Sequence, residues 1–325
     1  MTSAATFQQS LFQNSFLRGL TRWLDAIPHP PLALEISSDR IAVARWSRAG
    51  SLDSFAVELL PLGAIVPSAV ETNLINSAAV TFAISKACER VRSREEDVAL
   101  ILPDPIIRVF VQHFEEFPRS AEEAIPMLRW KLKKSIPFEA DETIISYMRQ
   151  PPRESGVDVV TALARQRIIR EYESLAEGIK LYPGVVLSSS LAAISLLEEE
   201  KATLLARVSG SALTTAIVRS GVLCGYRCTE LPAHGAGLTP QMLLEEIFPV
   251  AAYYQDTWQE SIASVRLAGL GARLGEFVQP LEDEFHCEVR SLLQSAVSAG
   301  LIKDEARQLA DRELEGLVGW MLQKG

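Results

Sequence analysis

Few residues in the chain have the types and spacing that chemistry requires. Cys224 and Cys228 lie four positions apart on one face of an expected strand, a spacing compatible with a metal pair. No second pair of His or Cys residues joins them, so we expect buried thiols. No serine, histidine and acid pattern has a supporting motif. The four histidines stand alone: His29, His113, His234 and His286. The sequence therefore predicts neither a metal centre nor a catalytic triad.

Positive charge is concentrated in one short run, Arg-Trp-Lys-Leu-Lys-Lys at residues 129–134. This run could meet acidic lipid, but charged side chains of a helix commonly face solvent, and we interpret it as a solvated helix face. The net charge is −9 and the other basic residues are scattered. Nucleic-acid binding is not expected, because phosphate neutralisation needs clustered Lys and Arg.

Composition sets the broad class. With 325 residues and 48% hydrophobic content, the chain can bury two or more packed subdomains. Its four cysteines are too few and too dispersed for a disulfide framework, which favours a reducing, cytoplasmic compartment. The sequence starts without a secretory signal and contains no apolar run long enough to cross a membrane.

The elements that must position any site include a pattern that occurs twice. Residues 32–61 and 204–232 each contain three strand-like runs, a small polar turn, a turn ending in glycine, and a closing proline. The polar turns are residues 37–39 and 209–211. Two such meanders in one chain predict a duplicated fold with two similar halves.

Other segments have clear periodicity. Residues 97–187 show the order strand, strand, helix, strand, strand, helix, strand, which indicates a small α+β insertion. Within it, Ser120 and Glu123 form a capping box that opens a helix. Further elements are expected as helices over 71–94, 188–200, 241–258, 273–285 and 305–323, and as a strand over 264–268.

An amphipathic helix is predicted near the start of the sequence, and prolines end it at residues 28–31. Its apolar stripe consists of Phe7, Leu11, Phe12, Phe16, Leu20, Trp23, Leu24 and Ile27. One interpretation is a helix at the membrane surface, giving residues 7–27 a peripheral membrane contact. The other is a helix docked on its own domain or on a neighbouring subunit. We favour docking, because two arginines give little attraction to anionic lipid.

Two meanders with a subdomain between them, followed by a late strand and a Gly-Leu-Gly-Ala turn, resemble the layout of the actin-like nucleotide-binding superfamily. Within it, Arg129-Trp130-Lys131 leading to Ile136-Pro137-Phe138, then acidic residues and Tyr147, resembles the PilM family of type IV pilus assembly proteins. The resemblance covers roughly residues 32–323. It implies an α/β, actin-like duplicated fold with an inserted α+β subdomain and a much reduced fourth subdomain. The implied division is an N-terminal helix and linker (1–31), a first lobe (32–96), the inserted subdomain (97–187) and a second lobe (188–325).

The resemblance also implies a function. PilM-family proteins are cytoplasmic and dock at the inner membrane by binding the short cytoplasmic tail of a membrane partner, PilN, in a groove beside the inserted subdomain. The chain is thus expected to be a scaffold that binds such a tail and other pilus assembly proteins. The groove residues implied here are Val43, Arg45, Trp46, Trp130, Ile136, Pro137 and Phe138. The alternatives are an ATP-binding switch and a cytoplasmic component of type II secretion.

The superfamily holds phosphates with two hairpins and adenosine with a glycine-rich turn. The first hairpin usually reads Asp-Ile-Gly, whereas here Glu35 and Ile36 precede Ser37 and Ser38. The second usually repeats that motif, and here Arg207 and Val208 precede Ser209 and Gly210, which reverses a metal-organising charge. The adenosine turn keeps Gly269 and Gly271.

One wall of the superfamily's nucleotide cleft is also missing. Only residues 233–240 separate the second meander from the helix at 241–258, and eight residues cannot form a domain. We therefore expect a degenerate site that does not hydrolyse ATP, with no cofactor and no metal. Binding of ATP without magnesium stays open, because a cation at position 207 could neutralise a phosphate.

Overall fold

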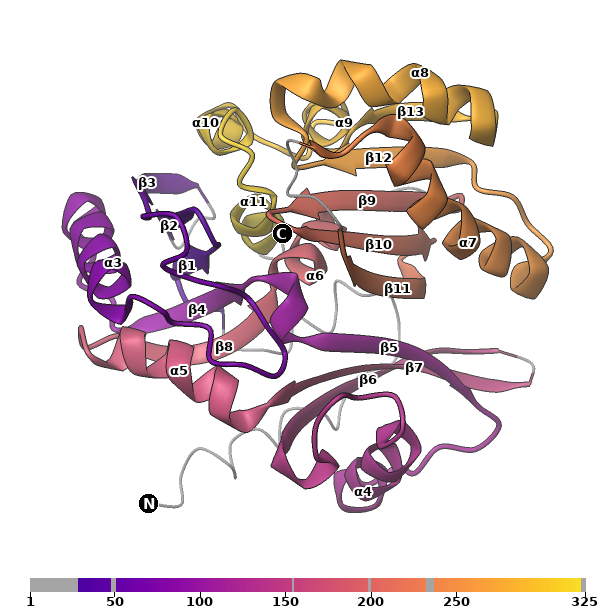
Figure 1. The fold of residues 1–325 in the computed structure, drawn as a ribbon, viewed down its shortest axis with the longest axis horizontal. Coiled ribbons are helices and arrows are strands. Elements are labelled where there is room, and N and C mark those ends of the chain that lie inside the picture. The colour runs from indigo at the N-terminus through magenta and orange to yellow at the C-terminus, as the bar shows by residue number, and fades with distance from the viewer. Residues whose placement is uncertain (1–28, 48–50, 154, 198–199, 232–236, 323–325) are drawn as a thin grey trace.

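The chain is described from a computed structural model that covers residues 29–47, 51–153, 155–197, 200–231 and 237–322. Two lobes, each built on a five-stranded sheet, stand above a third, smaller sheet (Figure 1). The amphipathic stretch at 7–27 lies outside the described residues. Within the described residues, no helix is both long enough and apolar enough to cross a membrane.

The first lobe is a mixed sheet in the order β3-β2-β1-β4-β8. Its antiparallel meander continues into two parallel strands, because the chain returns through helices on the sheet's face. Helix α3 packs against β2 and β3, and α5 packs against β8. The bounds are β1 (Leu32–Ile36), β2 (Arg40–Trp46), β3 (Leu52–Leu59), β4 (Asp97–Leu102), β8 (Tyr182–Ser188), α3 (Ser77–Val91) and α5 (Gln166–Glu177).

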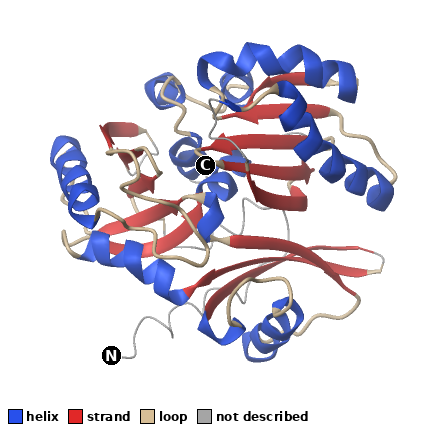
Figure 2. Ribbon diagram, viewed as in Figure 1, coloured by secondary structure: helices blue, strands red, loops and turns tan. Residues whose placement is uncertain are grey.

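The second lobe repeats this arrangement in the order β11-β10-β9-β12-β13, which confirms the predicted duplication. Helices α7 and α8 cover the outer face of this sheet, while its inner face joins the core shared with the first lobe (Figure 2). The bounds are β9 (Thr203–Ser209), β10 (Ala212–Arg219), β11 (Val222–Glu230), β12 (Ser264–Ala268), β13 (Glu288–Ser291), α7 (Pro240–Trp258), α8 (Leu274–Phe285) and α9 (Leu292–Ser298).

The inserted subdomain is smaller than the expected span of 97–187. Strands β4 and β8 pair within the first sheet, so they belong to the first lobe, as does α5 beside β8. The separate sheet has the order β5-β7-β6 and carries α4. The bounds are β5 (Arg108–Phe114), α4 (Ala121–Leu132), β6 (Thr143–Arg153) and β7 (Gly156–Arg165). Ser120 caps α4 as predicted, since its Oγ accepts a bond from the Glu123 N–H.

Two expected helices are shorter than the sequence pattern indicates. The helix expected at 188–200 is α6 (Ser189–Ala193) followed by a single 3₁₀ turn, Ile194–Leu196. The helix expected at 305–323 is broken into α10 (Arg307–Ala310) and α11 (Glu315–Leu322). The break occurs at Glu313, whose φ of 54° is left-handed, and the Leu314 N–H closes the turn on the Leu309 carbonyl. The chain thereby turns inward, and α11 packs against α6 and β1 of the first lobe.

The inserted sheet also contacts the second lobe. Strand β5 lies beside β11 (Figure 1). The buried Gln150 side chain donates to the Leu223 carbonyl and accepts from the Leu223 N–H, both at 2.8 Å. At the far end of the sheet, Arg153 stacks on Trp258 of α7, 3.4 Å from the ring centroid. The inserted subdomain therefore joins both lobes.

Candidate functional site

Two buried charged residues occupy matching positions in the two lobes. Glu35 is the fourth residue of the five-residue β1, and Arg207 is the third residue from the end of β9. Each is followed by one apolar residue and then by the polar turn. Both side chains are almost completely buried. Arg207 Nη2 lies 3.6 Å from Glu35 Oε1, so the two lobes are joined by an ion pair where their first strands face one another.

Arg207 contacts two further carboxylates. Its Nη1 lies 3.2 Å from Asp104 Oδ2, and its Nε lies 3.5 Å from Glu315 Oε2. Asp104 follows β4 in a 3₁₀ turn (Asp104–Ile106), and Glu315 opens α11. We call these four residues, Glu35, Asp104, Arg207 and Glu315, the interlobe cluster.

Asp104 has several donors besides the guanidinium. It accepts bonds from the Ser190 N–H at 2.8 Å, from Ser190 Oγ at 2.5 Å and from Thr214 Oγ1 at 3.0 Å. Ser190 lies at the start of α6, on the side of the first lobe, whereas Thr214 lies on β10 of the second lobe. The Asp104 carboxylate therefore joins the lobes even apart from Arg207.

Helix α11 closes the cluster from the other side. Glu35 Oε2 accepts a bond from the Leu317 N–H at 3.1 Å, and Glu35 Oε1 accepts one from Ser189 Oγ at 2.5 Å. A Cβ at Gly316 would lie 2.6 Å from Glu35 Oε1, and one at Gly319 would lie 2.1 Å from the Ala192 carbonyl oxygen. Only glycine allows α11 to approach this closely.

The three turns singled out in the sequence meet at the same place. Gly210 (φ 60°) packs on the first polar turn, since a Cβ there would lie 3.0 Å from Ser38 Oγ. Gly269 (φ 72°) lies directly on the Val208 carbonyl. Ser37 Oγ donates within its own turn to Asp39, and Ser209 lies at the end of β9. Gly271, at φ 56°, hydrogen-bonds through its backbone to the Glu313 carboxylate.

Burial and charge oppose one another in this cluster. Burial raises the pKa of Glu35, and Arg207 opposes that rise. For Arg207, burial alone would lower the pKa, but the carboxylates of Glu315, Asp104 and Glu35 together raise it, so the guanidinium stays charged. Burial raises the pKa of Glu313 too, and the neighbouring Glu315 adds to the effect. The cluster thus pairs one fixed cation with an excess of carboxyl groups.

These residues do not fit a nucleotide with its magnesium ion. The two polar turns approach closely, since a Cβ at Gly210 would lie 3.0 Å from Ser38 Oγ, and the position that would organise a metal carries a buried arginine. A triphosphate would bring several more negative charges to a cluster that already has more carboxyl groups than cations. In the described part of the chain, no group of three or more His, Cys, Asp or Glu residues is arranged to hold a metal ion.

The groove residues implied by the resemblance do not lie together. Val43 and Trp46 are buried in the core of the first lobe between β1 and β3, so their expected role as groove lining is wrong. Arg45 is half-buried and forms an ion pair with Asp53 on the neighbouring strand β3. Trp130 is 79% exposed on α4. It lies two positions from both Leu128 and Leu132, roughly 200° around the helix from each, and so faces away from the packed side.

A better defined seam joins the first lobe to the inserted subdomain. Arg165, at the end of β7, bonds Glu142 through Nε at 2.7 Å and donates to the Val70 carbonyl at 3.0 Å. Arg167 donates to the same carbonyl at 2.9 Å, and Glu171 of α5 accepts the Asn73 N–H at 2.9 Å. The loop between β3 and α3 is thereby fixed against β7 and α5.

Exposed and half-buried apolar side chains flank this seam. Val66 and Ile75 are both exposed and lie on the loop that Arg165 and Arg167 hold. On the other side, Ile136, Pro137 and Phe138 form the turn that leads from α4 to the 3₁₀ turn Ala140–Glu142, which carries Glu142. The seam therefore offers apolar surface next to fixed polar groups.

Sequence reasoning identified Glu35 and Arg207 of the interlobe cluster and missed the other two members, Asp104 and Glu315. The donors Ser190 and Thr214 were also not expected to contribute to a site. Two signals could have indicated it: opposite charges occupy matching positions in otherwise apolar strands of the duplicated meanders, and an acidic residue opens an otherwise apolar last helix.

The chain has a two-lobed α/β fold of the actin-like kind, in which an internal ion-pair cluster stands between the lobes. Comparison with solved structures agrees with this fold. The chain is similar to a structure described as the PilM–PilN type IV pilus biogenesis complex, with 18% identity, a TM-score of 0.70, and coverage of 91% of this chain and 99% of that one.

Two further solved structures are similar at lower TM-scores. One is a Bacteroides thetaiotaomicron protein with an actin-like ATPase fold, at 11% identity and a TM-score of 0.48, covering 85% of this chain and 98% of that one. The other is the cytoplasmic domain of EpsL, an inner membrane component of the type II secretion system of Vibrio cholerae, at 12% identity and 0.46, covering 84% and 95%. No family model and no curated protein sequence matches the chain.

Proposed function

We propose that the chain is a scaffold of a type IV pilus or related secretion machine, which binds the short cytoplasmic tail of an inner-membrane partner and does not hydrolyse ATP. The observation that carries this proposal is its similarity, over nearly the whole of both chains, to the structure named for the PilM–PilN complex. On this proposal the chain acts in the cytoplasm at the inner membrane, with other pilus assembly proteins as further partners.

The seam between the first lobe and the inserted subdomain is the proposed binding site for the tail. Val66 and Ile75 on one side, and Phe138 on the other, would contact apolar residues of an extended peptide. The arginines beneath them, Arg165 and Arg167, are already bonded to the Val70 carbonyl. A peptide would therefore meet a preorganised surface, which lowers the entropic cost of binding.

The interlobe cluster supports a scaffold over a nucleotide-driven switch. A switch needs lobes that open and close around a ligand. Here Arg207, Asp104, Glu315 and the donors to Glu35 join the lobes through groups that would be left buried and unpaired if the lobes separated. Partner binding is therefore expected to be independent of nucleotide.

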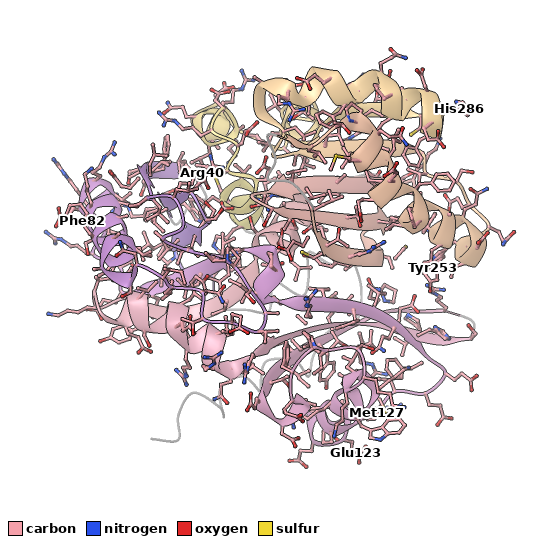
Figure 3. All side chains as sticks on the ribbon, viewed as in Figure 1. Arg40, Phe82, Glu123, Met127, Tyr253 and His286 are labelled. Atoms are coloured by element: carbon pink, nitrogen blue, oxygen red, sulfur yellow. The ribbon has the colours of Figure 1, made fainter. Side chains whose placement is uncertain are left out.

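Fluorescence anisotropy tests the binding site. The probe is a labelled synthetic peptide with the sequence of the short cytoplasmic tail of the proposed PilN-like inner-membrane partner. Ile75→Asp and Phe138→Ala are each expected to weaken binding at least about tenfold. The matched control is Tyr253→Ala, which removes an exposed aromatic ring on α7 of the second lobe, far from the seam (Figure 3). Equal binding by all four proteins would contradict the site.

Calorimetry and phosphate release test the absence of hydrolysis. ATP with Mg²⁺ is expected to leave the tail's affinity unchanged, and no phosphate should be released. Micromolar binding of Mg·ATP together with measurable turnover would contradict the scaffold and favour the switch.

A further inference from the structure

The outer face of the second lobe carries an unusual combination of acid and exposed aromatic groups. Helices α7 and α8 contain no Lys or Arg, and their acidic residues are Glu245, Glu246, Asp256, Glu276, Glu282, Asp283 and Glu284. Phe248 is 53% exposed and Tyr253 is 67% exposed on α7. This face is therefore both strongly acidic and partly apolar.

A depression of about 400 Å³ lies between these helices. Gln241, Leu244, Phe248 and Pro249 supply its apolar and neutral lining from α7, while Glu245 and Glu284 border it. Among the described residues, neither Glu245 nor Glu284 forms an ion pair, although Glu246 pairs with Arg227 and Glu276 with Arg273. Glu245 accepts a hydrogen bond from Gln241 at 3.1 Å. The depression thus offers an apolar floor between two carboxylates that lack a cationic partner among the described residues.

The opposite combination occurs at the C-terminal end of α4 and in the turn that follows it, at residues 129–134, which we call the basic tip. This segment has four positive charges and no acid, and Trp130 faces outward at its centre. Arg129 donates to the Thr143 carbonyl and Lys131 lies over the Phe114 ring, whereas Lys133 and Lys134 are exposed. Basic residues are favourable at the C-terminal end of any helix, because they interact with the helix dipole. An outward tryptophan has no such explanation, because burying one large aromatic ring is strongly favourable.

The two surfaces face different directions on the molecule. Figure 1 shows α4 at the bottom of the view, below the β5–β7 sheet, with α7 and α8 along the right and top of the second lobe. Figure 3 shows Met127 and Glu123 on α4 separated in the same way from His286 at the end of α8. One molecule can therefore present both surfaces at once to two neighbours.

We propose that the basic tip of one copy of this chain docks in the α7–α8 depression of the next copy. Trp130 occupies the depression against Leu244 and Phe248, and Lys133 and Lys134 pair with Glu245 and Glu284. The contact is heterologous, since different surfaces meet, and it therefore builds head-to-tail assemblies rather than a closed twofold dimer. It uses neither the seam nor the interlobe cluster, so it stands or falls independently of the proposed function.

Sedimentation velocity of the full chain over a wide concentration range tests the contact. The weight-average mass is expected to rise with concentration in low salt and to rise less in high salt, because exposed charge pairs are screened. Trp130→Ala is expected to weaken association about thirtyfold, as for a central aromatic in an interface. The control Phe82→Ala removes another exposed aromatic ring, on α3, and should leave association unchanged.

Charge reversal gives the sharper test. A tip-reversed protein, Lys133→Glu with Lys134→Glu, and a face-reversed protein, Glu245→Lys with Glu284→Lys, should each stay monomeric, while an equimolar mixture should associate. Reversing Lys201 and Lys303, which lie elsewhere and are also exposed, keeps the same change in net charge and should have no effect. The proposal is overturned if the wild-type chain stays monomeric throughout, or if either reversed protein associates like the wild type. It is equally overturned if the two folded reversed proteins fail to associate when mixed.

Discussion

Replacing Arg207 by methionine tests the interlobe cluster most directly. Methionine keeps an unbranched side chain of similar reach but removes the cation. Glu35, Asp104 and Glu315 would then remain buried without the guanidinium that lies 3.2 to 3.6 Å from one oxygen of each.

The expected loss of stability follows from these distances. At an effective dielectric constant of about 20, each contact contributes roughly 5 kcal/mol of gross Coulomb attraction, and desolvation of the four groups offsets most of the total. Removing one partner of a buried ion pair typically costs about 3–5 kcal/mol, because the remaining charge is left uncompensated. A loss of this size is a large fraction of the stability of an ordinary domain.

Urea unfolding followed by circular dichroism measures the loss. A second protein addresses the case in which Arg207→Met does not fold: it adds Glu35→Gln and Glu315→Gln, which remove the uncompensated charges. Asp104 is kept, because Ser190 and Thr214 still donate to it. This triple variant should recover most of the lost stability. If Arg207→Met alone costs less than about 1 kcal/mol, the value of an exposed pair, the cluster does not hold the lobes together.

Two further predictions concern α11 and pH. Gly319→Ala should destabilise the chain by about 1–3 kcal/mol in urea unfolding, because the added Cβ would clash with the Ala192 carbonyl. In the control, Gly275→Ala on α8, the added Cβ meets no atom within 4 Å, so this change should be neutral or stabilising. Burial raises the folded pKa of Glu35, so the contribution of Glu35 to the stability of the wild type falls as pH rises above about 4.5. The stability of Glu35→Gln relative to that of the wild type should therefore increase as pH rises. The pKa of Glu58 is lowered by its bonds to Lys86 and Arg90, so its effect on stability has the opposite pH dependence. The stability of Glu58→Gln relative to that of the wild type should therefore increase as pH falls below about 4.5. Parallel pH profiles for the two variants would contradict both assignments.

The elements with strong local patterns were predictable from the sequence. Both meanders, the strand Ser264–Ala268 and the two outer helices of the second lobe are confirmed almost to the residue. In each case the apolar periodicity, the turn residues and the flanking prolines or glycines all favour one structure. The start of α4 was predictable for the same reason, since Ser120 supplies a local cap.

Features set by distant contacts were not predictable. The pattern at 305–323 reads as one helix, but Arg40 of β2 donates to the Arg312 and Glu313 carbonyls and stabilises a break there. Pairing decides that β4 and β8 join the first sheet, and nothing local in those strands identifies their neighbours. The burial of Val43 and Trp46 likewise follows from pairing on both sides of β2.

The candidate site was partly predictable. The sequence identified Glu35, Arg207 and the glycine turns as departures from a nucleotide site, and the structure brings them together. It could not show that Arg207 pairs with Glu35, because their separation in sequence hides a contact made only when two lobes fold together. Asp104 and Glu315 were missed for the same reason.

The return of α11 to β1 and α6 has a consequence for how the chain acquires its structure. Residues near 320 complete a layer whose first strand begins at residue 32, so the first lobe cannot be finished until the strands of the second lobe and then α11 have been synthesised. Until α11 arrives, Glu35 lacks the Leu317 N–H, and the surface of β1 and α6 on which Gly316 and Gly319 pack is open to other apolar helices. Protection of that nascent surface, more than the order in which the two sheets form, should govern the yield of folded protein in the cell.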